Sequence, residues 1–139
     1  MIKAVPDFIP GHIGHPDFLI IGLSPSSNTK PFKNGTFARL LTWTTHVGLK
    51  QWDFCNIINE VNSVDTKLVN VEELKKKCEN RKKIIALGGV VSKVLDKYNI
   101  PHYKIDHPSP RNRNLNNKEY EAKMLESLKD YLDAWDYTI

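Results

Sequence analysis

The hydrophobic residues of the chain occur in short blocks that alternate with amphipathic stretches. Residues 18–21 are continuously apolar and end at Gly22, which is typical of a strand covered on both faces. Residues 52–58, 83–87 and 101–105 have the same short apolar or β-branched character. The pattern therefore predicts four strands.

Between these blocks, apolar residues recur at helical spacing. The spacing predicts helices over residues 35–47 and 71–80, a third helix opened by Gly88-Gly89, and a last one over residues 118–135, capped by Asn116 or Asn117. The last helix is expected to place six side chains in the core: Tyr120, Met124, Leu125, Leu128, Tyr131 and Leu132.

This order of elements predicts the fold. Strands that alternate with helices pair in parallel through right-handed crossovers. We therefore expect the α/β class, as a three-layer α/β/α sandwich with a central, mostly parallel sheet of about four strands. No repeat or linker divides the chain, so a single domain over residues 1–139 is expected.

The composition is that of an ordinary globular domain, with 40% hydrophobic and 26% charged residues. Twenty Lys and Arg against 16 Asp and Glu give a net charge of +4, which suits a polyanionic partner but equally a merely basic protein. Cys55 and Cys78 are too few for a disulfide framework or a Cys-rich cluster, so both are expected to be reduced.

No stretch approaches the roughly 20 apolar residues that cross a bilayer. We expect a soluble intracellular protein, cytoplasmic or nuclear and not secreted, with no membrane contact.

Two loops that follow predicted strands carry unusual sequences, and ligands bind at the carboxyl ends of strands in such sheets. In the segment Gly-Leu-Ser-Pro-Ser-Ser of residues 22–27, a proline stiffens the turn just after Ser24. In the segment His-Pro-Ser-Pro-Arg-Asn-Arg of residues 107–113, a histidine precedes a rigid ridge and two arginines, which suits a phosphate backbone.

These two loops resemble the signature loops of the uracil-DNA glycosylase superfamily, a Gly-x-x-Pro turn after the first strand and a His-Pro-Ser loop after the last. Pro31-Phe32 is similar to the segment whose aromatic ring stacks on the flipped base. Residues 54–58 look like the strand with the base-reading asparagine, and residues 86–91 like the strand-to-helix junction. The resemblance runs from about residue 18 to residue 113, and the second loop is closest to the single-strand-selective and mismatch-specific branches.

The resemblance implies a monomeric base-excision-repair enzyme that flips uracil or a related deaminated base out of DNA and hydrolyses its N-glycosidic bond. It implies no cofactor and no metal, and DNA, single- or double-stranded, as the partner. The catalytic residues that it implies are Ser24 and His107. The implied substrate-binding residues are Gly22, Leu23, Pro25, Phe32 and Asn56, and the implied DNA-binding residues are Ser26, Pro108, Ser109, Pro110, Arg111, Asn112 and Arg113.

Ser24 departs from the pattern of the family, in which active members typically carry Asp or Asn before the proline and one branch carries Ala. A hydroxyl is a poor general base at neutral pH, so a slower enzyme is expected. The alternative is a glycosylase fold kept as a DNA-binding module with little or no chemistry.

A nucleotide- or phosphate-binding α/β protein ranks third, because the turn at Gly22 lacks Walker and Rossmann spacing. Structural roles for Phe32 and Asn56 also stay open. The lysine-rich stretch around residues 75–83 is interpreted as a solvated face.

Overall fold

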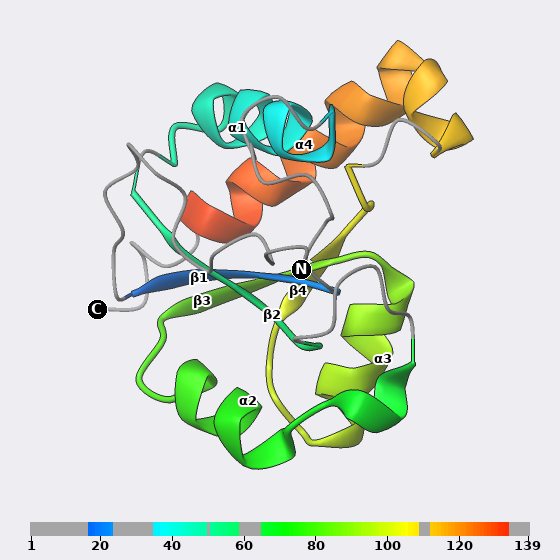
Figure 1. Ribbon diagram of the computed structural model, residues 1–139. Coiled ribbons are helices and arrows are strands. Elements are labelled where there is room, and N and C mark those ends of the chain that lie inside the picture. Colours follow the sequence, from blue (N-terminus) through cyan, green and yellow to red (C-terminus); the bar gives the residue numbers. More distant parts are fainter. Residues whose placement is uncertain (1–16, 24–34, 50, 59–64, 109–111, 134–139) are drawn as a thin grey trace.

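The computed structural model describes residues 17–23, 35–49, 51–58, 65–108 and 112–133, with only the helical backbone at residues 35–37 (Figure 1). In chain order the elements are β1 (Phe18–Gly22), α1 (Gly35–His46), β2 (Asp53–Asn56), η2 (Thr66–Leu68), α2 (Val71–Cys78), β3 (Lys83–Leu87), α3 (Gly89–Lys97), β4 (Tyr103–Ile105), η3 (Arg113–Asn116) and α4 (Lys118–Asp133). The short 3-10 turns η2 and η3 were not predicted.

The four strands form one parallel sheet in the order β2-β1-β3-β4. Ile20 of β1 is level with Phe54 of β2 and with Ile85 of β3. The sheet confirms the predicted α/β class. The strand order itself was not predicted.

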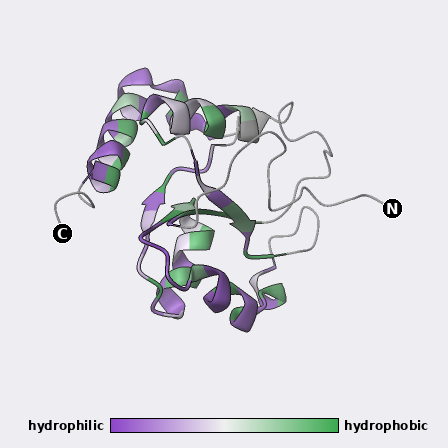
Figure 2. Cartoon of the chain, turned by 90° about the vertical axis from the view of Figure 1, so that its left-hand side faces the viewer, coloured by the Kyte–Doolittle hydropathy of each residue, from purple (hydrophilic) through white to green (hydrophobic). Residues whose placement is uncertain are grey.

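Helices cover both faces of the sheet, with α1 and α4 on one side and α2 and α3 on the other (Figure 1). Successive strand residues point to opposite faces, so Ile20 packs with Leu40 of α1 and Leu128 of α4, whereas Leu19 packs in a second cluster with Leu95 of α3. The helices carry both hydrophilic and hydrophobic residues, as expected for elements with one face on a sheet (Figure 2).

Two strands are shorter than predicted. β2 ends at Asn56. Beyond it, the backbone N–H groups of Ile57 and Ile58 still donate to the carbonyls of Gly22 (3.0 Å) and Leu23 (2.9 Å). β4 begins at Tyr103, after Pro101, which has no N–H to donate to a ladder.

Helices α1 and α2 also end earlier than the periodicity predicts. α2 ends at Cys78 and is followed by Asn80 with φ of 60°, a left-handed conformation that helices do not continue through. Asn117 is the cap of α4, where its side chain accepts from the backbone N–H groups of Glu119 (3.0 Å) and Tyr120 (3.2 Å).

The predicted core was wrong at Tyr120, whose side chain is 39% exposed because its hydroxyl bonds to a carboxylate outside the core. Trp43 was not predicted and is only 1% exposed. Its indole Nε1 donates to Glu121 at 3.1 Å and so links α1 to α4.

None of the helices in the described part of the chain is long and apolar enough to cross a membrane.

Candidate functional site

The strand order creates a topological switch point between the two central strands. The chain leaves β1 for β2 on one side and leaves β3 for β4 on the other, with α1 and α3 on opposite faces (Figure 1). In open α/β sheets, ligands bind in the crevice outside the carboxyl ends of two such strands. Here those ends are Gly22 and Gly88.

Gly22 makes room for the side chain of Asn56, which is level with it on the neighbouring strand. A Cβ atom at Gly22 would lie 2.7 Å from Asn56 Oδ1 and 3.0 Å from Phe54 Cζ, so no larger residue fits without displacing a neighbour. Asn56 is 8% exposed. Its Nδ2 is buried and has no hydrogen-bond partner among the residues that the structure describes.

Gly88 makes room for His107 in the same way. Its φ of 91° lies in the left-handed region that favours glycine, and a Cβ atom would lie 3.3 Å from His107 Cβ. The backbone N–H of Gly88 donates to the carbonyl of Ile105 at 2.8 Å, which holds the end of β4 beside the start of α3.

The imidazole of His107 favours its neutral form. Burial lowers the pKa of His107 from its ordinary value, because desolvation disfavours the charged form. The ring is therefore neutral at pH 7 and has one N–H donor and one acceptor nitrogen. Among the described residues, none forms a hydrogen bond with either nitrogen.

The predicted pair Asn56 and His107 thus lies at one edge of the sheet, on its two outer strands, with Gly22 and Gly88 between them. Three strand spacings separate the outer strands, or about 14 Å. Each polar side chain lies against the glycine that follows or ends the adjacent central strand.

Other predicted residues have structural contacts of their own. The carbonyl of Leu23 accepts from Ile58, and Pro108 is buried. Asn112 donates to Asp106 (3.0 Å) and to the carbonyl of His107 (3.3 Å), which gives it a structural role beside the predicted contact with DNA. Arg113 is exposed at the start of η3.

Seven predicted residues lie outside the described part of the chain, and their roles stay predictions: Ser24, Pro25, Ser26, Phe32, Ser109, Pro110 and Arg111. Sequence analysis assigned no functional role to Asp106 and predicted Tyr120 only as a core residue; the side chains of these two residues bond to each other at 2.7 Å. The only signal in the sequence was an acidic residue directly before the histidine.

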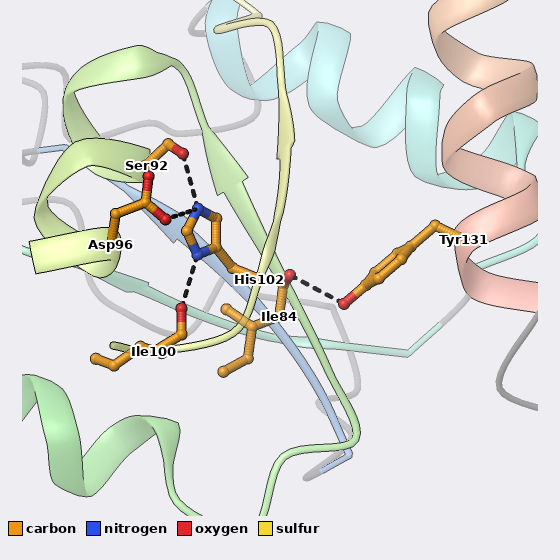
Figure 3. Close-up of polar contacts among 6 residues, drawn as sticks. All are labelled: Ile84, Ser92, Asp96, Ile100, His102 and Tyr131. Carbon is orange, nitrogen blue, oxygen red and sulfur yellow. Dashed lines mark hydrogen bonds and ion pairs between the residues drawn. The ribbon is translucent and has the colours of Figure 1, made fainter. Parts of the chain in front are cut away.

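Another histidine, His102, whose side chain is 6% exposed, has a different environment (Figure 3). Its Nε2 is 2.7 Å from Ser92 Oγ, and its Nδ1 is 2.8 Å from the carbonyl oxygen of Ile100. Both ring nitrogens are therefore satisfied within the protein. Ser92 is 8% exposed and the pair lies in no described cavity, so we interpret it as a link between α3 and the turn before β4.

The two described cavities lie elsewhere. One lies between α1 and α4 and is lined by residues such as Arg39 and Trp43. The other is lined in part by Arg81, which forms an ion pair with Asp53, and by Cys78. Burial raises the pKa of Cys78 to about 11, so this thiol is protonated at neutral pH and is a poor nucleophile.

Comparison of the chain with protein-family models, with curated proteins and with solved structures gave no match. The functional interpretation therefore depends on the residues at this edge of the sheet and on the resemblance of the two loops.

Proposed function

We propose that the protein is a monofunctional uracil-DNA glycosylase, which flips uracil or a related deaminated base out of DNA and hydrolyses its N-glycosidic bond. The proposal is based on one arrangement: Asn56 and His107 lie on either side of Gly22 and Gly88 at the switch point of the sheet. The resemblance of the two loops assigns base reading to Asn56 and leaving-group stabilisation to His107.

The environment of Asn56 supports a role in reading a base. A buried amide N–H without a partner costs about 1 to 3 kcal/mol, so it is normally satisfied by something. The side chain offers donors and an acceptor, and the Watson–Crick edge of a flipped pyrimidine offers the complementary groups. A base bound beside Gly22 would supply the missing partner of Nδ2.

The environment of His107 supports a role in stabilising the leaving group. When the C1′–N bond breaks, its electron pair leaves with the base and negative charge develops on the base oxygens. A neutral imidazole that donates one N–H to such an oxygen lowers the barrier by roughly 2.7 to 4 kcal/mol in analogous sites. Burial keeps His107 in the neutral form that this role needs.

Water then adds to C1′ of the oxocarbenium-like sugar and loses a proton to solvent, while the released base anion takes up a proton from solvent, which leaves an abasic site and the free base. We assign the orientation of this water to Ser24. A hydroxyl holds water by hydrogen bonding but accepts its proton poorly, so slow turnover is expected. Ser24→Asn should preserve or raise the rate of base release, because an amide positions the water better.

DNA binding is proposed to use the exposed Arg113 together with the arginine at position 111. Phosphate contacts of this kind release counterions, so affinity should fall steeply as salt is added. Binding to a uracil-containing oligonucleotide that stays constant between low and high salt would contradict this surface.

The decisive experiment is a base-release assay on oligonucleotides that contain uracil, hypoxanthine or xanthine, followed by alkali to cleave abasic sites. We expect free base and an alkali-labile strand from the wild type, and loss of both from His107→Ala. His46→Ala is the matched control, since His46 is exposed at the end of α1.

Prolonged incubation without release would contradict the proposal. If such a protein still binds uracil-containing DNA and Ser24→Asn restores release, the alternative applies, and the wild type is a DNA-binding module on a glycosylase fold.

A further inference from the structure

Asp106, the residue between β4 and His107, binds two side chains from later in the chain. Its Oδ1 accepts from the hydroxyl of Tyr120 at 2.7 Å, and its Oδ2 accepts from Nδ2 of Asn112 at 3.0 Å. Because each carboxylate oxygen already accepts a hydrogen bond, Asp106 is not placed as a free general base. It instead joins the end of β4 to η3 and α4.

Asn112 uses its whole amide group within this network. Besides Asp106, Nδ2 donates to the backbone carbonyl of His107 at 3.3 Å. The oxygen Oδ1 accepts from the backbone N–H of Asn114 at 3.1 Å and so caps η3. One side chain therefore connects the residue before His107, the backbone of His107 and the following turn.

Tyr120 brings α4 into the same network. Its side chain is 39% exposed, so core packing does not explain its position. The backbone N–H of Tyr120 is capped by Asn117, which fixes the first turn of α4, and the phenol extends from there to Asp106. The hydrogen bond to Asp106 raises the pKa of Tyr120, so the hydroxyl keeps its proton and remains a donor.

We infer that Asp106, Asn112 and Tyr120 form a brace that positions His107 for leaving-group stabilisation, an inference that rests on the function proposed above. The chain around His107 is held at two points. The carbonyl of Ile105, two residues before His107, accepts from the backbone N–H of Gly88, and the carbonyl of His107 itself accepts from Asn112, the cap of η3. With its backbone held, the ring keeps its place beside Gly88 without any hydrogen bond from the described residues to its nitrogens.

Asp106 and Tyr120 are positioning residues in this inference, since they act through His107. A donor displaced by about 1 Å can cost about 10²-fold in rate. Loosening the brace should therefore lower the rate of base release while substrate affinity changes little.

Two variants remove different parts of the brace. Tyr120→Phe deletes the hydroxyl that binds Asp106, and Asn112→Ser deletes both donors while a hydroxyl can still cap η3. Each has a matched control. Tyr131→Phe removes a hydroxyl from the other end of α4, where it bonds to the carbonyl of Ile84 (Figure 3), and Asn70→Ser changes the cap of α2.

The primary measurement is the NMR signals of the histidine side chains in ¹⁵N-labelled protein, with His102 as the internal reference. We expect the imidazole signals of His107 to shift or broaden in both brace variants, with those of His102 unchanged and with no change at His107 in either control. In the base-release assay, kcat of Tyr120→Phe should fall roughly 10- to 10²-fold with KM nearly constant, because Tyr120, unlike Asn112, is not predicted to contact DNA.

Unchanged His107 signals in both brace variants, when these fold like the wild type, would overturn the inference. A fall in melting temperature with the same His107 signals would also count against it, because it would reduce the network to a stabilising role. If the wild type releases no base, the proposed function fails, whereas the NMR measurement still decides whether the brace positions His107.

Discussion

A half-buried histidine lies just before β4 and another just after it, and the two residues have opposite environments. Before the strand, His102 has Ser92 on one ring nitrogen and the carbonyl of Ile100 on the other (Figure 3). After the strand, the backbone of His107 is held by Asn112, but its ring nitrogens have no hydrogen-bond partner among the described residues. An unpaired polar group that is removed from water is costly unless a partner is found, so the second histidine is the candidate for binding a ligand.

Two asparagines differ in the same way, one with its hydrogen bonds satisfied and one without: Asn70 at the start of α2 and Asn56 at the end of β2. Asn70 uses its side chain to cap α2, accepting from Glu73 at 3.1 Å. Asn56 is buried beside Gly22 with its Nδ2 unpartnered among the described residues. A satisfied polar side chain indicates a structural role, and an unsatisfied buried one is a candidate for binding.

The largest difference between the two histidines should appear in catalysis. His107→Ala should lower base release by roughly 10² to 10³, the usual effect of deleting one oxyanion donor. Ser92→Ala should leave base release unchanged and lower the free energy of unfolding by about 1 kcal/mol, because it removes one hydrogen bond from His102. Single-turnover release of uracil and urea denaturation measure the two effects, and equal losses of activity would end the distinction.

A smaller effect, on stability, is expected from a substitution at Gly22, which lies against the side chain of Asn56. Gly22→Ala places a Cβ atom against Asn56 and Phe54 and should cost about 1 to 3 kcal/mol of stability by overpacking. Gly89→Ala is the control, because, beyond its own helix and chain neighbours, no atom of the described residues lies within 4 Å of the added Cβ, and helix propensity favours Ala. Chemical denaturation of both variants tests this, and a Gly22→Ala protein as stable as the wild type would contradict the close contact.

The smallest effect is the pH dependence of stability that His107 contributes. Its pKa is lower in the folded than in the unfolded protein, so the unfolded chain takes up the proton first as the pH falls below about 6.5. The stability that the neutral ring contributes is therefore complete above that pH and declines below it. His107→Gln should flatten this decline in denaturation curves measured from about pH 5 to 7.5, whereas an unaltered slope would argue against a buried neutral ring.

The order and type of the main elements followed from the sequence, because they depend on local patterns. A run such as Leu19-Ile20-Ile21 is apolar on both faces, and this alone indicates a central strand of a covered sheet. The placement of Asn56 and His107 at one edge also followed, because parallel strands bring all their carboxyl ends together. Element ends were less predictable, as at Pro101 and Asn80, since they depend on single backbone conformations.

The tertiary structure alone decided the order β2-β1-β3-β4, and with it which residues face each other across the edge. Gly22 and Gly88 lie between Asn56 and His107 only because their strands are central, and no local pattern specifies which strands pair. The bond from Tyr120 to Asp106 is of the same kind. Helical periodicity predicted Tyr120 to be in the core, but the residue is exposed and its hydroxyl bonds to the carboxylate of Asp106. Periodicity describes one helix at a time, so it cannot predict a contact with a residue outside that helix.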